Sequence, residues 1–329
     1  MKTKVVLTVD TEASIAGAFA DANHRPLIHE PIAGMVGGKS EALGFLIDTL
    51  TEYGLVATFF AETVHTRYFT DSVMGGYVDQ LSRAGQDVQL HLHPCWLAFE
   101  NGRLEHSNPV TDQCCELELE QLAGLIEAGA GRIHAWTGMR PTGMRTGNFS
   151  TALSVFGAMK QTGLSCSSNI CLAVQRPPEP ELAVPGGAHD FAGIRELPVT
   201  CFADNGPVGQ GRLRPMQVTA LTAYEQIGLL NAAHDCGNPV VVIVTHPFEF
   251  VKRADFRYSH LRRNRIVQNR FRRLCGFLTD NRERFDVVPL AAAAAAVDGG
   301  TVWKELKGSA VSSTVRAAAN LLNDKLAFI

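Results

Sequence analysis

The sequence lacks long hydrophobic runs. No apolar segment among its 329 residues reaches the roughly 20 residues that a helix needs to cross a bilayer. The apolar run near the start, residues 5–9, stops at Asp10 and is shorter than the core of a secretory leader. We therefore expect no transmembrane segment and a cytoplasmic location.

The sequence also has no large excess of one charge and no cysteine pattern typical of a disulfide framework. Lysine and arginine number 30 against 33 aspartates and glutamates, a formal net charge of −3 that gives no reason to expect a nucleic-acid partner. The eight cysteines are scattered apart from Cys114 and Cys115, as in proteins that keep their thiols reduced. Because 46% of the residues are hydrophobic, the chain can bury a core, and its partner has to be inferred from local motifs.

Strand-like and helix-like segments alternate through most of the chain, which is typical of parallel βαβ units. About seven units without a break in composition predict an α/β fold, a single-domain (β/α) barrel over residues 1–298. Helices are expected at 40–53, 73–84, 112–128, 150–162, 217–236 and 259–280. Residues 299–329 are predicted to form a C-terminal helical extension that docks on the barrel through Val302, Leu306, Val315, Leu321, Leu322 and Leu326.

One predicted strand carries polar residues on one of its faces. Alternate side chains of an extended chain share a face, so Gln89, His91 and His93 point the same way. They lie at the C-terminal end of the strand, where α/β barrels keep their active sites. Two imidazoles in this spacing can bind one metal ion, although two hydrogen-bonded structural histidines explain the spacing alone equally well.

Other predicted strands also end in polar residues. Asp10 and Glu12 follow the first strand and can face one cavity if the extended geometry persists to Glu12. His246 ends the Val/Ile-rich strand 239–245. Residues 13–38 show no sustained period, and we expect this long loop to border the site.

Five short motifs occur together, in an order and spacing that resemble those of the polysaccharide deacetylase (NodB-homology) family, which is similar to carbohydrate esterase family 4. They are Thr8–Glu12, Gly85–His91, Arg145–Asn148, Glu196–Pro198 and Thr245–Pro247. The resemblance covers roughly residues 3–290 and implies a distorted (β/α) barrel. It also implies an enzyme that uses a divalent metal to remove N-acetyl, or occasionally O-acetyl, groups from sugars. The His-Leu-His-Pro-x-Trp pattern at 91–96 is similar to a branch associated with bacterial cell-surface polysaccharide genes.

The resemblance also implies roles for individual residues. By position, Asp10 matches the catalytic base, Arg145 the arginine that orients the base, and His246 the general acid. His91 matches the first histidine that binds the metal.

Two positions depart from the family pattern. The metal-binding aspartate that usually follows the base is Thr11 here, so we assign its role to Glu12. The second histidine usually stands four residues after the first, where this chain has Cys95, so we assign its role to His93. Cys95 is an alternative ligand because zinc accepts thiolate sulfur, and a site without metal is a further alternative. The expected cofactor is a divalent metal, Zn2+ first, with Co2+, Ni2+ or Mn2+ as alternatives.

Trp96, Arg140 and Asn148, which lie in or beside these motifs, are the candidate substrate-binding residues. Trp96 could stack on a sugar ring or lie in the core. The stretch Lys252–Arg273 holds nine basic residues and the single acidic residue Asp255. This composition fits either a solvated helix face or contact with the diphosphate of a substrate.

The sequence thus predicts a metal-dependent hydrolase that removes an N-acetyl or related acyl group from a sugar. The substrate would be a cell-surface glycan or its intracellular precursor, with a nucleotide- or lipid-linked sugar among the candidates. One alternative is a metal-independent amidase on the same barrel, and another is a non-catalytic carbohydrate-binding or regulatory protein. The combination of Asp10, Arg145 and His246 speaks against a binding protein, which needs neither base nor acid. Homo-oligomerisation is compatible with the sequence.

Overall fold

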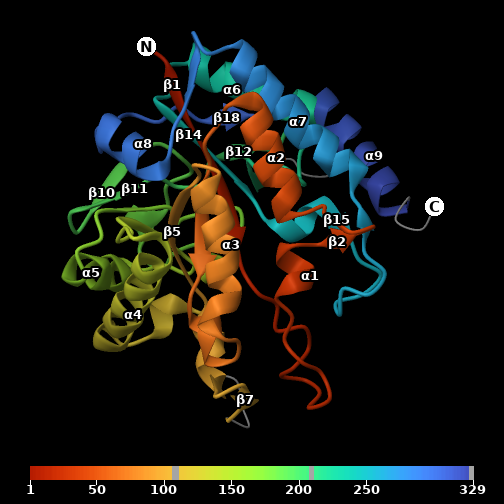
Figure 1. Ribbon diagram of the computed structural model, residues 1–329. Helices are drawn as coiled ribbons and strands as arrows, with labels where there is room; N and C mark the ends of the chain where they lie inside the picture. Colours follow the sequence, from red (N-terminus) through yellow and green to blue (C-terminus); the bar gives the residue numbers. More distant parts are fainter. Residues whose placement is uncertain (106–110, 207–210, 326–329) are drawn as a thin grey trace.

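The computed structural model describes residues 1–105, 111–206 and 211–325 and shows a curled sheet covered by helices on its outer face (Figure 1). The sheet has nine strands, in the order β10-β11-β9-β8-β5-β4-β1-β14, with β17 also paired to β1. They are β1 (Thr3–Thr11), β4 (Thr58–Glu62), β5 (Asp87–Leu92), β8 (Gly143–Thr146), β9 (Cys166–Ser167), β10 (His189–Phe191), β11 (Ile194–Glu196), β14 (Val240–Thr245) and β17 (Phe285–Val287). All neighbours in this sheet are parallel except β10 and β11.

The helices and the small strand pairs complete the fold. The helices are α1 (His29–Ile32), α2 (Leu43–Tyr53), α3 (Asp71–Arg83), α4 (Leu119–Thr137), α5 (Leu153–Gln161), α6 (Ala223–Asp235), α7 (Arg265–Asp280), α8 (Leu290–Ala296) and α9 (Ala310–Lys325). The short strands are β2 (Met35–Val36) with β3 (Lys39–Ser40), β6 (Phe99–Glu100) with β7 (Arg103–Leu104), β15 (Val251–Lys252) with β16 (Arg262–Arg263), and β12 (Cys201–Ala203) with β13 (Leu213–Pro215) and β18 (Leu306–Lys307). The predicted single-domain distorted barrel is confirmed.

The two faces of the sheet belong to two different hydrophobic clusters. On β1, Val5, Leu7 and Val9 pack in the cluster that the outer helices share, whereas Val6 belongs to the barrel interior. Residues of α8 fill the same interior cluster, and Leu290 approaches Gly143 at the start of β8. The helix therefore closes the N-terminal end of the barrel. Thr8 and Asp10 share the inward face with Val6 and lie toward the opposite end, which Figure 1 shows in its lower half.

Within the described parts of the chain, no regular strand closes the barrel. On its free side, β14 is bonded by irregular backbone: Thr200 N–H donates to Val242 O, Val244 N–H to Met216 O, and Val218 N–H to Val244 O. These bonds satisfy the edge of β14 where a paired strand would otherwise stand. The curvature that brings the strand ends together is therefore kept without full closure.

Three helices begin six or seven residues later than their periodicity predicts. The helix expected at 112–128 begins at Leu119, since Asp112 lies in a loop and a 3-10 turn occupies Cys114–Glu116. The helix expected at 259–280 begins at Arg265, since Asn264 caps it by accepting from Val267 N–H and the preceding residues form the β15–β16 pair. The helix expected at 217–236 begins at Ala223, where Thr222 accepts from Glu225 N–H. Side-chain caps thus mark the starts of α6 and α7, whereas α4 follows a 3-10 turn and has no side-chain cap.

The C-terminal helix is held by charge rather than by the predicted apolar residues. Val302, Val315, Leu321 and Leu322 are 79%, 52%, 56% and 57% exposed, so the prediction that they dock is wrong, while Leu306 is buried in β18. Leu326 lies outside the described residues. The inward side of α9 instead carries Arg316, which pairs with Asp204 and with Glu225 of α6. Both carboxylates are buried, and Arg214 also pairs with Asp204.

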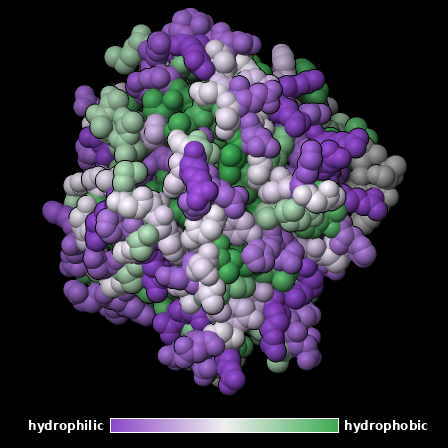
Figure 2. All heavy atoms as spheres, in the orientation of Figure 1, coloured by the Kyte–Doolittle hydropathy of each residue, from purple (hydrophilic) through white to green (hydrophobic). Residues whose placement is uncertain are grey.

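Hydrophilic side chains cover most of the face seen in Figure 2, with hydrophobic residues visible mainly between them. Among the described helices, none is long and apolar enough to span a membrane.

We expect Arg316→Ala to lower the free energy of unfolding by about 3 kcal/mol, because it leaves the buried Glu225 carboxylate without its cation. Urea unfolding followed by circular dichroism measures the change. Arg83→Ala is the control: Arg83 pairs with Asp79 at the surface, and its loss should cost less than about 1 kcal/mol. Equal losses in the two variants would mean that the buried pairs do not hold α9.

Candidate functional site

The candidate site lies where β1, β5, β8 and β14 end. Register pairs His91 of β5 with Arg145 of β8, and Val9 of β1 with Thr245 of β14. Because these strands are parallel, the residues at their carboxyl ends meet at one end of the barrel. Glu12, His91, His93, Asp10, Arg145 and His246, all predicted from the sequence, are brought together there.

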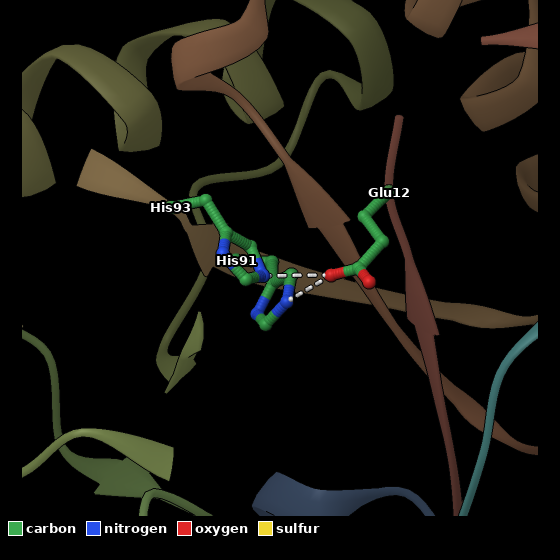
Figure 3. A group of neighbouring side chains, drawn as sticks. All are labelled: Glu12, His91 and His93. Carbon is green, nitrogen blue, oxygen red and sulfur yellow. Dashed lines mark hydrogen bonds and ion pairs between the residues drawn. The ribbon is translucent and has the colours of Figure 1, made fainter. Parts of the chain in front are cut away.

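Glu12 and the two histidines form a compact group (Figure 3). One carboxylate oxygen of Glu12 lies 3.1 Å from His91 Nε2 and 2.7 Å from His93 Nε2. Burial opposes ionisation of Glu12, but the imidazoles outweigh it and hold the pKa of this carboxyl well below its usual range. His91 is almost wholly buried, while Glu12 and His93 keep 20% and 14% of their side chains exposed, so the group opens on one side.

The hydrogen bonds of the two rings fit this group to a divalent metal. His91 Nδ1 lies 2.7 Å from Arg145 O, an acceptor only, so Nδ1 carries a proton and Nε2 is the ring atom directed at Glu12, where its lone pair could bind a metal. His93 has the same arrangement, with Nδ1 2.9 Å from an Asp112 carboxylate oxygen. Two Nε2 lone pairs and a carboxylate oxygen that face one another would repel, so a cation is needed between them. Protons on the rings or a metal ion can supply it. Imidazole nitrogen and carboxylate oxygen are ligands that Zn2+ accepts.

Asp112, which the sequence analysis missed, holds the outer side of His93. Its carboxylate receives a hydrogen bond from Asn148 Nδ2 (2.8 Å) and another from the backbone N–H of Cys95 (3.2 Å). Burial opposes protonation of His93, but Glu12 and Asp112 together raise the pKa of its ring well above the usual range. No local motif marked Asp112, since it stands 19 residues after His93 in a segment with helical periodicity.

Cys95 belongs to a different group from the other proposed ligands. Its sulfur clusters with His93 and Asp112, whereas Glu12, His91 and His93 form the first group without it. Burial, with Asp112 beside it, raises the pKa of the thiol, which favours the protonated form. The geometry therefore favours His93 over Cys95 as the third residue beside Glu12 and His91.

Gly147 makes room for His93. A Cβ on Gly147 would lie 2.4 Å from two ring atoms of His93, far inside van der Waals contact. From the other side, the buried Glu62 carboxylate accepts from the backbone N–H of His93 at 3.4 Å. The ring is thus placed by a carboxylate, a backbone bond and an absent side chain.

Asp10 lies between a guanidinium and an imidazole. Arg145 Nη1 donates to Asp10 Oδ1 at 2.7 Å, and His246 Nε2 stands 3.7 Å from Asp10 Oδ2. Arg145 is fully buried and also donates to Thr8 Oγ1, Ser168 O and Ser168 Oγ. Its guanidinium lies 4.5 Å from the centre of the Phe60 ring. These contacts leave Arg145 a single orientation, so the Asp10 carboxylate is fixed with it.

Glu196 holds the chain on both sides of Ser168. Its carboxylate accepts from Asn169 N–H and Ile170 N–H at 3.1 and 2.9 Å, and from the Ser167 hydroxyl. Burial raises the pKa of Glu196 to about 7, although these hydrogen bonds act in the opposite direction. The Glu196–Pro198 motif is therefore linked to Asp10 through Ser168 and Arg145.

His246 has its own carboxylate partner, Glu249, in the turn after β14. Glu249 Oε1 lies 2.9 Å from His246 Nδ1, and the Thr245 hydroxyl donates to Glu249 Oε2. Burial opposes protonation of the ring, but Glu249, with Asp10 and Glu12, raises the pKa of His246 to about 9. The imidazolium therefore carries a proton at Nε2 at neutral pH, beside Asp10.

No protein-family model matches the chain, and no curated protein matches it in sequence. Solved structures do match: a Mycobacterium smegmatis protein assigned as a polysaccharide deacetylase superposes with a TM-score of 0.54 at 16% identity, over 92% of this chain and 94% of that one. The chain has the polysaccharide-deacetylase fold. Other matches are a family 4 carbohydrate esterase from Streptomyces lividans solved with acetate (TM-score 0.42, 14% identity, 87% of this chain and 91% of that one) and a family 4 pseudoenzyme from Bacillus anthracis (0.44, 9%, 89% and 66%).

On this deacetylase fold a cavity of about 250 Å³ opens beside the Glu12 group. Glu12, His93 and Asp112 line it together with Phe248 and with residues 13–15 and 31, so the expectation that the 13–38 loop borders the site is met. The ring of Phe248 stacks on His246 at 4.8 Å and is only partly buried. Phe248 therefore offers an aromatic face near the candidate acid.

The three residues predicted to bind substrate have other positions. Trp96 is 1% exposed and packs against Phe99, Phe69 and His65, so it reaches the cavity wall only as a core residue. Arg140 precedes β8, at the far end of the strand from Arg145, and pairs with Glu127 of α4. Asn148 is exposed near the site but bonds Asp112.

The basic stretch 252–273 is dispersed over several contacts. Lys252 donates to Asn323 O, Arg263 lies 3.7 Å from Glu41, Arg270 donates to Thr219 O, and Arg272 stacks on Phe45. Much of its charge therefore serves structural contacts rather than one phosphate-binding face.

We expect Glu249→Gln to lower the pKa of His246 from about 9 toward its ordinary value near 6.5, since the variant removes the adjacent negative charge. In the parent chain the imidazolium persists below pH 9 and is lost as the pH rises through that value. An NMR titration of the imidazole signals measures both pKa values. Glu127→Gln, at the remote pair with Arg140, is the control, and an unchanged His246 in Glu249→Gln would contradict the proposed cause.

We expect Asp112→Ala to weaken Zn2+ binding by about 10- to 100-fold, because the variant frees the His93 ring to turn away. Competition with a chromophoric chelator measures the affinity. Cys95→Ser is the matched variant from the same cluster and should bind Zn2+ nearly as well as the parent chain. A large loss in Cys95→Ser would make the thiol a ligand in place of His93.

Proposed function

We propose that the protein is a metal-dependent hydrolase that removes an N-acetyl or related acyl group from a sugar. The observation that carries the proposal is the position of Asp10. Its carboxylate is bonded to Arg145, faces the His246 imidazolium, and stands two residues before Glu12 in the candidate metal group.

Amide hydrolysis needs an activated water, stabilisation of the developing oxyanion and a proton for the leaving amine. Glu12, His91 and His93 would hold a divalent metal, Zn2+ by ligand type, which activates water and polarises the acyl carbonyl when bound.

Asp10 is the proposed base. Arg145 occupies Oδ1, so Oδ2 is the oxygen left to accept a proton from the attacking water. The buried guanidinium fixes the direction of this carboxylate. Because Arg145 is itself locked by Ser168, the base is pre-oriented before substrate arrives.

His246 is the proposed acid. Glu249 keeps its ring protonated at neutral pH, and Nε2 faces the Asp10 side of the site, where the leaving nitrogen would depart. Proton donation at this point is typically worth about 10²- to 10⁴-fold in rate. Phe248, stacked on the same ring, would give the sugar an apolar surface next to the acid.

The substrate is proposed to be a cell-surface glycan or its precursor. Support comes from the resemblance of the motifs and from the deacetylase fold of the Mycobacterium smegmatis protein. Cytoplasmic location, linkage to a nucleotide or lipid, the identity of the metal and the His-Leu-His-Pro-x-Trp branch stay predictions.

The test separates the two carboxylates. We expect Glu12→Ala to lose Zn2+, whereas Asp10→Asn keeps Zn2+ and loses about 10²- to 10⁴-fold of its acetate-releasing activity on N-acetylated glycans. Metal content by mass spectrometry and acetate release are the two measurements, with Glu127→Ala as a remote control.

The alternatives give different results. Full activity without metal would identify a metal-independent amidase. A parent chain that binds Zn2+ and glycan but releases no acetate would be a binding protein. If Asp10→Asn stripped the metal while Glu12→Ala kept it, the roles of the two carboxylates would be exchanged.

A further inference from the structure

The cavity that Glu12 lines also has an arginine in its lining. Arg253 follows β15 and lines the cavity together with Tyr258, Phe248 and Glu12. Its guanidinium lies 4.4 Å from the centre of the Tyr258 ring. Such stacking leaves the edge of the guanidinium, with its fork of N–H donors, free for an anion.

Among the described residues, no carboxylate forms an ion pair with Arg253. The acidic residue nearest in sequence, Asp255, is used within its own turn, where it accepts from Arg257 N–H (2.9 Å), Ser259 N–H (3.1 Å) and Ser259 Oγ (2.8 Å). Glu12 is taken by the two histidines. The charge of Arg253 is thus held at the cavity without being neutralised there.

Tyr258 is a rigid support for this arginine. The ring is 6% exposed, and the residue adopts φ 59°, a left-handed conformation that costs a bulky residue free energy. Burial raises the pKa of Tyr258 to about 12, so its hydroxyl stays neutral at physiological pH. Arg253 therefore stacks on a fixed, uncharged surface.

The segment that carries both residues is anchored to the N-terminal loop. Arg257 Nη1 donates to the carbonyl oxygens of Ala16 and Arg25, each at 2.6 Å. Phe256 contacts His24 edge to face and would be hit by a side chain at Gly17. These contacts join segments more than 200 residues apart and tie the segment that carries Arg253 to the N-terminal loop that follows Glu12.

We propose that the cavity binds an acidic N-acylated sugar, whose carboxylate or phosphate is held by Arg253 while its acyl group lies at the Glu12 group. The position of the acyl group rests on the proposed function; the binding of the anion does not. Charge-assisted, bidentate contacts of this kind are the strongest that an arginine makes.

Binding is measured first, by titration calorimetry on the full chain loaded with Zn2+ and carrying Asp10→Asn to prevent turnover. The probes are N-acetylglucosamine, the corresponding uronic acid and the 6-phosphate. We expect at least one acidic sugar to bind about 10- to 100-fold more tightly than the neutral sugar, with a preference that falls as salt is added. Whichever acidic probe binds more tightly identifies the anion as carboxylate or phosphate.

Arg253→Gln should remove this preference, and Arg253→Lys should keep part of it, because lysine keeps the charge and loses the fork. Arg263→Gln is the matched control: Arg263 lies in β16 of the same strand pair but faces Glu41, outside the cavity. It should keep the preference. Equal binding of the three sugars, no binding of any of them, or a preference that survives Arg253→Gln would overturn the inference.

Acetate release from the same sugars, measured on the Zn2+-loaded chain with Asp10 intact, separates the two proposals. Acetate release with no preference for the acidic sugars would support the deacetylase function and contradict the anion site. A preference in binding that depends on Arg253, without any release of acetate, would do the reverse.

Discussion

The buried ion pair between Arg145 and Asp10 is the contact on which the site depends. A guanidinium with no exposed surface joins β8 to Thr8 and Asp10 of β1 and to Ser168 after β9. Isolated, either charge would be costly inside the barrel, so each makes the burial of the other tolerable. Because Arg145 of β8 donates both to β1 and to the residue after β9, the ends of these three strands cannot shift independently, and the carboxylate stays aimed at His246.

Much of the fold follows from local patterns. The inward face of β1 and the polar face of β5 are consequences of a two-residue period, which is why Asp10, His91 and His93 were found from sequence alone. The open edge of β14 and the late starts of α6 and α7 were not, because they depend on irregular backbone bonds and side-chain caps. The predicted docking of the C-terminal helix through apolar residues was wrong. Those residues are exposed, and a buried arginine holds the helix instead.

The site residues that the motifs predicted lie together in the structure. The residues that hold them in place were not predicted, because they lie outside these motifs. Asp112 holds His93 and Glu249 holds His246, yet each is an ordinary acidic residue in its local sequence. For Trp96 the sequence left stacking on a sugar and a core position open; the residue lies in the core, and the partly exposed Phe248 presents its ring at the cavity. Hydrophobicity does not distinguish these two aromatic residues, but their burial does.

One hydrogen atom in place of a methyl group determines which arrangement of imidazoles this barrel can hold. The ring of His93, just after β5, occupies the space where a side chain at position 147, just after β8, would lie. Only one of these two side chains can fill that space. A chain with any larger residue at 147 would have to bring its second imidazole from another point on the loop. Gly147 and the position of His93 therefore depend on each other sterically. A change at one of them is tolerated only together with a change at the other.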